Sequence, residues 1–357
     1  MVKVSMKQQK QQSKATIKEI AKQARTSIAT VSRVLRNKEY PVSDDLRQRV
    51  LEAAKELQYT PNLIGRYLKS GTNHEIGVIV PTITNPYYSQ LILGIEAVLE
   101  CNQYSMLLCN SFRNEEKEYT YVDLLRQKQV QGIIIASIAK NHDYLHDYIR
   151  QGLELVTFDQ DVSDLVCTKI TVDYEKGANL AIQHLFAMGH EKIGFLSAPL
   201  TRKSRLIIHD TYVKAMRTHG CQLEKEWIMI NDAEVENPGE IYEFENGKIL
   251  GARLTSLKNR PTAVMVINDM TAYGVMHELG QRGIYIPEDI SIISFDNIFF
   301  SQITNPPLTT ISCSSGEMGR LAAEYLLKKL SGDSIPQAST ILEPQLVERS
   351  SVKRMVG

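Results

Sequence analysis

The residues of this chain that could bind a small molecule stand where predicted β-strands end. Nine apolar runs are typical of buried strands, and acids, amides and tyrosines follow several of them. Ligands of open α/β sheets bind beyond the carboxyl ends of the strands. Carboxylates accept hydrogen bonds from hydroxyl groups, and aromatic rings pack on the faces of sugars. The acids, amides and tyrosines at these strand ends, with Tyr87, Tyr88, Asp159, Asp269 and Asp296 among them, therefore suit a polyol ligand.

Each of these acids has a simpler explanation when it is taken alone. An acid that follows a strand is often a helix cap or an ordinary loop residue. The prediction of a binding site therefore rests on the group of residues and on their shared position, and not on any single side chain.

The sequence shows no catalytic motif. G-x-S-x-G, H-E-x-x-H, P-loop and G-x-G-x-x-G patterns are absent, so nothing indicates an enzyme. His142 and His146 share a helical face at the spacing of half a metal site, but the sequence places no third ligand. That segment is polar throughout and is better explained as a solvated face. We therefore expect no metal and no cofactor.

The strand-like runs alternate with amphipathic helical stretches. Most of the runs are continuously apolar, as is typical of parallel strands that are buried on both faces. This alternation predicts an α/β core, and the number of strands suffices for two sheets in tandem. A chain of 357 residues is long enough for such a core and a further small domain.

The segment from Thr16 to Asn37 predicts two short helices joined by a tight turn. Thr16 and Glu19 have the spacing of a capping box, and Ser27 is a good cap for the second helix. The second helix turns its valines inward and leaves small side chains, hydroxyls and arginines exposed, namely Ile28, Ala29, Thr30, Ser32, Arg33 and Arg36. Such a face fits the major groove of DNA. A surface helical hairpin without a ligand is the alternative.

Charge is distributed unevenly along a chain whose net charge is zero. Residues 1–70 carry 15 Lys and Arg against 6 Asp and Glu, so the remainder is correspondingly acidic. A basic N-terminal region followed by an acidic remainder indicates that the N-terminal region binds an anionic polymer. Residues 1–14 predict a disordered basic arm and lack the apolar region of a secretory signal. No apolar run reaches the ~18 residues of a membrane span.

The five cysteines are odd in number and show no C-x-x-C spacing. They predict reduced thiols in a cytoplasmic protein and not a disulfide or zinc framework. Together with the absence of a signal peptide and of a membrane span, they lead us to expect a cytoplasmic location.

Several segments resemble the LacI/GalR family of bacterial transcriptional regulators. TIKEIAKQA, S-x-A-T-V-S-R-V-L and Y-x-P-N are similar to the family's DNA-binding headpiece. Other segments resemble its two-lobed, periplasmic-binding-protein-like core, namely IGVIVPTITNPYY, VDYEKGANLAIQHLFAMGHEKIGF, INDMTAYG, IPEDISIISFDN and PPLTTI. The resemblance runs from about Thr16 to about Leu330. It implies a sequence-specific repressor that is controlled by a small-molecule effector, a sugar or sugar derivative, bound between the lobes.

The resemblance also implies roles for single residues. Effector contacts fall first to Asp269 and Asp296, and then to Tyr87, Tyr88 and Asp159. Base readout falls to Ile28, Ala29 and Arg33, and phosphate contacts fall to Thr16, Ser27, Thr30, Ser32 and Asn62. Leu68 matches the family leucine that wedges into the minor groove. The protein would bind a near-palindromic operator in double-stranded DNA as a homodimer. A solute-binding protein of a transporter, or an α/β enzyme on the same core, remains the alternative.

The expected organisation follows from these segments. It comprises a basic arm 1–14, a helix-turn-helix headpiece 15–60, a hinge helix or plain linker 61–72, a first lobe 73–172 plus 304–345, and a second lobe 173–303.

Two departures from the family pattern stand out. Ile208 occupies the position of a common effector-clamping arginine, and Arg202, Arg205 and His209 are nearby but out of register. The effector is therefore expected to differ from the family's commonest sugars, or not to be a free sugar. Arg25 stands at a turn position that favours glycine, where a positive φ costs about 1 kcal/mol.

Overall fold

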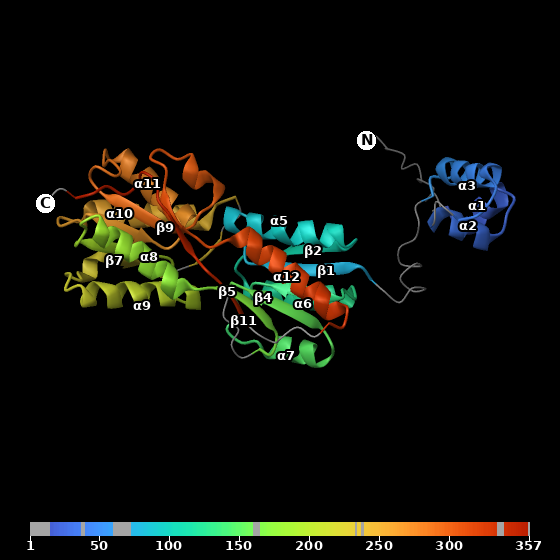
Figure 1. Ribbon diagram of the computed structural model, residues 1–357, viewed down its shortest axis with the longest axis horizontal. Coiled ribbons are helices and arrows are strands. Elements are labelled where there is room, and N and C mark those ends of the chain that lie inside the picture. The colour runs from blue at the N-terminus through green and yellow to red at the C-terminus, as the bar shows by residue number, and fades with distance from the viewer. Residues whose placement is uncertain are drawn as a thin grey trace, which may run out of the picture. The chain divides into compact units, whose positions relative to one another are not determined.

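The computed structural model describes residues 15–36, 40–59, 73–159, 165–232, 234–236, 239–333 and 339–355. The chain divides into two compact units, Met1–Thr72 and Asn73–Gly357 (Figure 1). The predictions for the arm 1–14, for the hinge segment 61–72, and for Asn62 and Leu68 within it lie outside the described residues.

The N-terminal unit contains three helices, α1 (Ile17–Gln23), α2 (Ile28–Arg36) and α3 (Asp44–Glu56). Their apolar faces enclose one small core that includes Ile20, Val31, Val34 and Val50. This core is what the helical spacing of the apolar residues predicts.

Local hydrogen bonds set the helix ends of this unit. Thr16 and Glu19 form the predicted capping box of α1. Ser27 Oγ accepts a hydrogen bond from the Thr30 backbone N–H at 3.0 Å, and Ser43 caps α3. Arg25, in the turn between α1 and α2, has a φ of +51° as predicted. The turn between α1 and α2 therefore requires a left-handed backbone conformation at a residue that is not glycine.

The first lobe of the larger unit is built on a parallel sheet with the order β11-β5-β4-β3-β1-β2. Its strands are β1 (Glu75–Val80), β2 (Ser105–Asn110), β3 (Gly132–Ile135), β4 (Glu154–Phe158), β5 (Thr168–Val172) and β11 (Ser339–Leu342). Helices cover both faces, namely α5 (Pro86–Cys101), α6 (Glu115–Gln127), α7 (Asp143–Arg150) and α12 (Ser315–Leu330) (Figure 1). Alternate residues of each central strand enter two different apolar cores, which explains their continuously apolar sequences.

The second lobe has a sheet with the order β12-β10-β9-β8-β6-β7. Its strands are β6 (Ile193–Ser197), β7 (Ile228–Ile230), β8 (Ala263–Val266), β9 (Ser291–Asp296), β10 (Thr309–Ser312) and β12 (Gln345–Val347), and only β12 pairs antiparallel within this described sheet. Its helices are α8 (Tyr174–Ala187), α9 (Lys203–Thr218), α10 (Tyr242–Ser256) and α11 (Asp269–Gln281), with short 3-10 turns η1 (Lys225–Trp227) and η2 (Phe299–Gln302).

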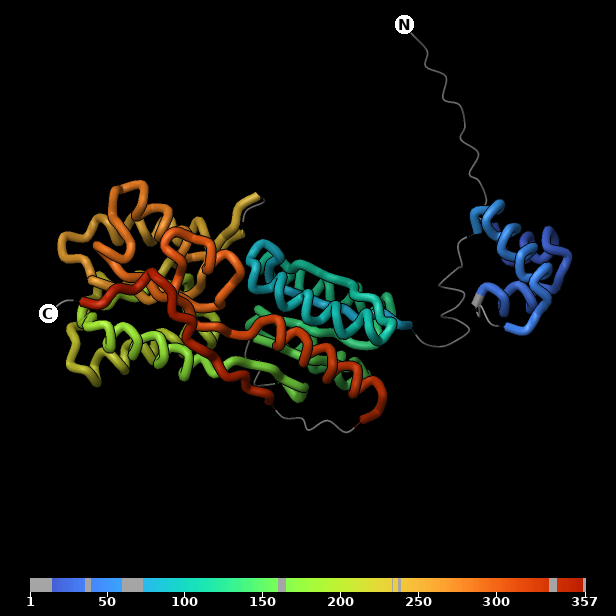
Figure 2. The backbone as a smooth tube through the Cα atoms, turned by 45° about the horizontal axis from the view of Figure 1, so that its top comes forward, coloured from blue at the N-terminus to red at the C-terminus, as the bar shows by residue number. Residues whose placement is uncertain are grey.

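The chain passes between the two sheets after β5, after β10 and after β11 (Figure 2). The prediction that residues 304–345 belong to the first lobe is wrong for β10, because this strand pairs in parallel with β9 of the second sheet. The C-terminal segment also returns to the second lobe, where Ser351 Oγ donates to the Ile292 carbonyl at 2.6 Å. A run of apolar residues predicts a strand, but it does not say which sheet that strand joins.

None of the helices that the structure describes combines the length and the apolar character needed to cross a membrane.

Candidate functional sites

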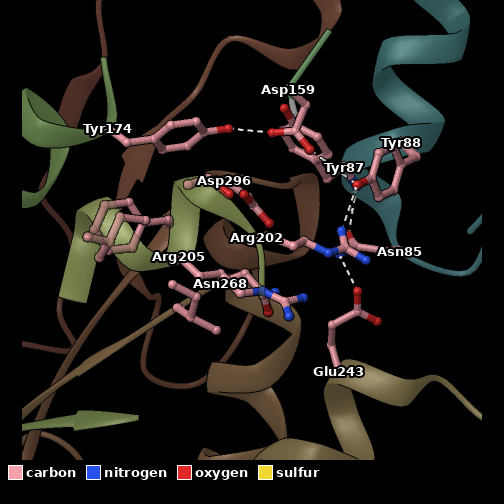
Figure 3. Close-up of a pocket in the computed structure, with 14 residues that line it drawn as sticks. Asn85, Tyr87, Tyr88, Asp159, Tyr174, Arg202, Arg205, Glu243, Asn268 and Asp296 are labelled. Atoms are coloured by element: carbon pink, nitrogen blue, oxygen red, sulfur yellow. Dashed lines mark hydrogen bonds between the residues drawn. The ribbon is translucent and has the colours of Figure 1, made fainter. Parts of the chain in front are cut away.

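A cavity of about 60 Å³ lies where the carboxyl ends of the two sheets face each other (Figure 3). The first lobe contributes Asn85, Tyr87, Tyr88 and Asp159, and Tyr174 begins α8 at the first crossing. The second lobe contributes Arg202, Ser204, Arg205, Ile208, Glu243, Ile267, Asn268, Phe295 and Asp296. Four of the predicted residues, Tyr87, Tyr88, Asp159 and Asp296, therefore line one cavity. Their contact with an effector stays a prediction.

One side of the cavity, which we call the acidic end, consists of Asp159, Asp296, Tyr88 and Tyr174. The Asp159 carboxylate accepts hydrogen bonds from the Tyr88 hydroxyl, at 3.2 Å, and from the Tyr174 hydroxyl. Asp159 follows β4 and Asp296 is the last residue of β9, and both have a positive φ, of +63° and +107° respectively. Such backbone conformations are costly for non-glycine residues and concentrate at ligand sites.

The two carboxyl groups of the acidic end are not equivalent. Burial raises the pKa of Asp296 well above its ordinary value, and the nearby carboxylates of Asp269 and Asp159 raise it further. Asp296 therefore keeps its proton to a higher pH than an exposed aspartate does. A protonated carboxyl can donate a hydrogen bond, so the acidic end can offer a donor as well as acceptors.

The opposite side, which we call the arginine end, holds Arg113, Arg202 and Arg205 around the carboxylate of Glu234. Arg113 Nη1 lies 2.6 Å from Glu234 Oε1, and Arg202 Nη2 lies 2.9 Å from the same oxygen. Arg205 binds both carboxylate oxygens, at 2.9 Å each. Burial alone would raise the pKa of Glu234, but Arg202, Arg205 and Arg113 outweigh it and hold that pKa far below its usual range.

The arginine end also joins the two lobes. Arg113 comes from the first lobe and forms further ion pairs with Glu236, at 3.2 Å, and with Glu243. Glu236 accepts hydrogen bonds from the first-lobe hydroxyls of Thr82, at 2.7 Å, and Thr84, at 3.1 Å. Polar contacts of the segment that follows β7 therefore hold the lobes together across the cleft.

Glu243 keeps acceptor capacity in this cleft. Its Oε1 atom accepts from Asn85 Nδ2 at 3.1 Å and from Arg113. Its buried Oε2 atom accepts no hydrogen bond from the residues that the structure describes. Because a buried carboxylate oxygen normally has a donor, Oε2 is suited to a hydroxyl or amino group of a ligand.

The structure contradicts the prediction that Asp269 contacts the effector. Asp269 is fully buried and does not line the cavity. Its carboxylate accepts hydrogen bonds from four groups, namely the hydroxyls of Ser294, Ser301 and Thr310 and the backbone N–H of Ile298. It begins α11 directly after Asn268, which lines the cavity and caps the helix. Adjacent residues at a strand end point in different directions, and the sequence pattern does not separate them.

The arginine end was not predicted from the sequence. The sequence indicates Arg202 and Arg205 only as out-of-register neighbours of Ile208. No sequence motif marks the other four members of the cluster as functional, namely Arg113, Glu234, Glu236 and Glu243. Arg113 and Glu234 are 121 positions apart, and each lies outside the regular strands. Ile208 itself lines the cavity beside Ile267 and Phe295, so an apolar surface replaces the family's arginine there.

The predicted DNA-binding residues that the structure describes lie on α2 and at the start of α1. Ser27, Ile28, Ala29 and Arg33 are exposed, Thr30 and Ser32 are partly exposed, and Thr16 caps α1. Arg33 Nη1 donates to the Tyr40 hydroxyl at 2.9 Å, and its guanidinium lies 5.5 Å from the centre of the Tyr40 ring. The helix thus presents small side chains and a positioned arginine to solvent.

Within the described residues, no three His, Cys, Asp or Glu side chains are arranged to hold a metal ion.

Comparison with known proteins matches a family model to each of the two units. The family described as bacterial regulatory proteins, lacI family, matches residues 16–62, and a periplasmic binding protein-like domain matches residues 182–352. The HTH-type transcriptional repressor PurR of Mannheimia succiniciproducens is 33% identical over 343 residues, which cover 96% of this chain and 99% of the relative.

Solved structures show the same arrangement. The Lac repressor bound to ONPG in its repressed state superimposes with a TM-score of 0.81 at 25% identity, covering 95% of this chain and all of that one. A LacI family regulator from Enterococcus faecium with bound ribose gives a TM-score of 0.70 at 28% identity, covering 79% of this chain and all of that one.

The chain belongs to the LacI family of transcriptional regulators. It is a helix-turn-helix repressor with an effector-binding core and not an enzyme, which confirms the predicted fold class and the predicted function at that level.

Proposed function

We propose that this repressor responds to a small hydroxyl-bearing effector, a sugar or sugar derivative, bound in the cleft between its lobes. The observation that carries the proposal is a single cavity lined by acids and aromatic rings from both lobes. Asp159 and the free Oε2 atom of Glu243 supply acceptors, and Tyr87, Tyr88 and Phe295 supply ring surfaces. The ribose-bound relative binds a ligand of this chemical class.

Operator recognition is assigned to α2, which would lie in the major groove of a near-palindromic duplex. Ile28, Ala29 and Arg33 read the bases in this proposal, and the hydroxyls of Thr16, Ser27, Thr30 and Ser32 bind phosphates. Their exposure, and the positioning of Arg33 by Tyr40, support it. Two such headpieces in a homodimer would match the two half-sites, and a protein that acts on DNA in this way works in the cytoplasm.

The cleft can influence the operator only if the effector prefers one arrangement of the lobes. Contacts between Arg113 and the glutamates of the second lobe set the arrangement seen here. An effector that binds among these groups strengthens or weakens the ion pairs between the lobes. It thereby changes the population of the lobe arrangement that binds DNA.

The test uses purified full-length protein and a panel of neutral sugars, nucleosides and their phosphates. We expect at least one compound to raise the thermal midpoint of the core, and Asp159→Asn to reduce its affinity at least about tenfold while Asp210→Asn, an exposed control, leaves it unchanged. A panel in which no compound binds contradicts the effector proposal. Failure to bind any duplex selected from a random DNA pool contradicts operator recognition.

A further inference from the structure

Three guanidinium groups meet on one carboxylate at the arginine end. The side chains of Arg113, Arg202 and Arg205 are 2%, 11% and 7% exposed, and that of Glu234 is 13% exposed. Together they donate four hydrogen bonds, of 2.6 to 2.9 Å, to the two oxygens of Glu234. Guanidinium groups match carboxylate and phosphate geometry closely, and here they surround a single anion.

The charges of this cluster constrain what can replace Glu234. The three arginines face three glutamates, Glu234, Glu236 and Glu243, so the group is neutral as it stands. Withdrawal of Glu234 leaves one uncompensated positive charge in a buried site, which is strongly unfavourable. A neutral ligand in its place would not remove that penalty. A ligand that carries a carboxylate or a phosphate would.

The space available points to the same exchange. The cavity at the arginine end holds about 60 Å³, whereas pockets for small ligands typically hold about 300–1,000 Å³; further space, about 240 Å³, lies beyond Asp159, Tyr174 and Ser204 and away from the arginines. Arg202 and Arg205 line the cavity and also bind Glu234, so Glu234 is one hydrogen bond away from the residues that line the space an effector must enter. Glu234 belongs to neither a helix nor a strand, and its withdrawal breaks no regular secondary structure.

We propose that Glu234 occupies the anion subsite of the effector, and that the effector is a polyol carrying a phosphate or a carboxylate group. The inference rests on the proposed function, because it assigns a chemical class to the ligand of the same cleft. The anionic group replaces the Glu234 carboxylate between Arg202, Arg205 and Arg113. The hydroxyl groups reach Asp159 and the Oε2 atom of Glu243, and the apolar surface at Ile208 and Phe295 packs against the carbon skeleton.

This arrangement accounts for the missing family arginine. An arginine at position 208 would add a fourth cation near a cluster that already balances three. In this chain one cation, Arg205, stands three residues before position 208 on α9, and the other, Arg202, directly precedes that helix; both bind the internal carboxylate.

The first experiment uses inorganic phosphate as the probe and full-length protein at constant ionic strength. Glu234→Ala removes the internal competitor, so we expect phosphate to bind this variant at least about tenfold more tightly than the wild type, measured by calorimetry and by the rise in thermal midpoint. Adding Arg205→Ala to that variant should abolish the gain. Glu245→Ala is the matched control, because it removes a partly exposed glutamate of α10 whose carboxylate forms an ion pair with Lys248 and takes no part in the arginine end.

A second arm compares ribose with ribose 5-phosphate on the wild-type protein, so it needs no variant to fold. We expect the phosphate ester to bind at least about tenfold more tightly than the neutral sugar. If Glu234→Ala does not fold, the isosteric Glu234→Gln variant takes its place in the first arm.

The outcomes separate the two proposals. A neutral sugar that binds the wild type with an affinity unchanged by Glu234→Ala overturns the anionic assignment and leaves the effector cleft standing. A folded variant that gains no phosphate affinity also overturns it. Absence of any ligand response in both arms contradicts the cleft itself.

Discussion

The headpiece and the cleft present their functional residues in opposite ways. On α2 the side chains assigned to DNA are exposed, and their few hydrogen bonds are local, such as that between Ser27 and Thr30. In the cleft the functional side chains are buried and bind one another across the lobes, as Arg113 and Glu234 do. A surface that binds an external polymer can remain open, whereas a closed cleft must satisfy its own charges. Substitutions in the cleft should therefore change the stability of the fold, whereas substitutions on the exposed face of α2 should change only DNA binding.

The largest effect is expected for Arg113→Ala. Removing this buried cation leaves Glu236 and Glu243 without their arginine, and loss of one partner of a buried ion pair typically costs about 3–5 kcal/mol. Denaturant unfolding of the full chain measures the loss. Arg150→Ala, which breaks an exposed pair with Asp147, is the control and should cost less than about 1 kcal/mol. Equal losses in the two variants would remove the distinction between buried and exposed pairs.

A smaller loss of stability is expected for Asp269→Asn. The asparagine amide has one acceptor oxygen in place of two and turns an NH₂ group toward the donors of Ser294, Ser301, Thr310 and Ile298. Leaving a buried group unsatisfied costs about 1–3 kcal/mol. The folded variant should bind effector as the wild type does, because Asp269 lies outside the cavity. A selective loss of ligand affinity at unchanged stability would restore Asp269 as a binding residue.

Arg33→Ala should leave the thermal midpoint unchanged and weaken operator binding by about 1–3 kcal/mol. The side chain is exposed, and its partners are the hydroxyl and the ring of Tyr40, so its removal opens no cavity. Fluorescence anisotropy with a fixed salt concentration checks the affinity, since salt alone shifts such constants strongly. An unaltered affinity in the folded variant would exclude α2 from the interface.

The smallest effect concerns the pH dependence of the acidic end. Burial raises the pKa of Asp296 in the folded state above its unfolded value, so stability from this group is full at low pH and is lost as pH rises through the folded pKa. Glu234 acts in the opposite sense, because its lowered pKa gives stability that is lost as pH falls.

Asp296→Asn mimics the protonated carboxyl group, so the variant should not lose stability as pH rises through the pKa of Asp296. We therefore expect its thermal midpoint to be slightly above that of the wild type at higher pH. Midpoints measured against pH for the wild type, for this variant and for the exposed control Asp210→Asn decide the matter. A variant that is less stable than the wild type at every pH would show that the Asp296 carboxylate is required in its charged form.

The same contrast explains what could be predicted from the sequence. Thr16 and Ser27 were predictable as caps because a cap depends on residues three positions away. Tyr88, Asp159 and Asp296 followed from the rule that ligands bind at strand ends. The pairing of Arg113 with Glu234 did not follow, because it depends on two loops, from different lobes, that only the folded core brings together. Asp269 was misplaced since position at a strand end does not determine side-chain direction.

The central claim is that occupation of the cleft controls operator binding, and linkage makes this claim directly measurable. A ligand that changes operator affinity must have its own affinity changed by the operator by the same factor. The measurement is an anisotropy titration of a duplex selected by the full-length protein, with and without saturating ribose 5-phosphate, at one salt concentration. The account predicts a change of about 5- to 150-fold in operator affinity. An operator affinity that stays the same while the ligand demonstrably occupies the cleft would contradict it.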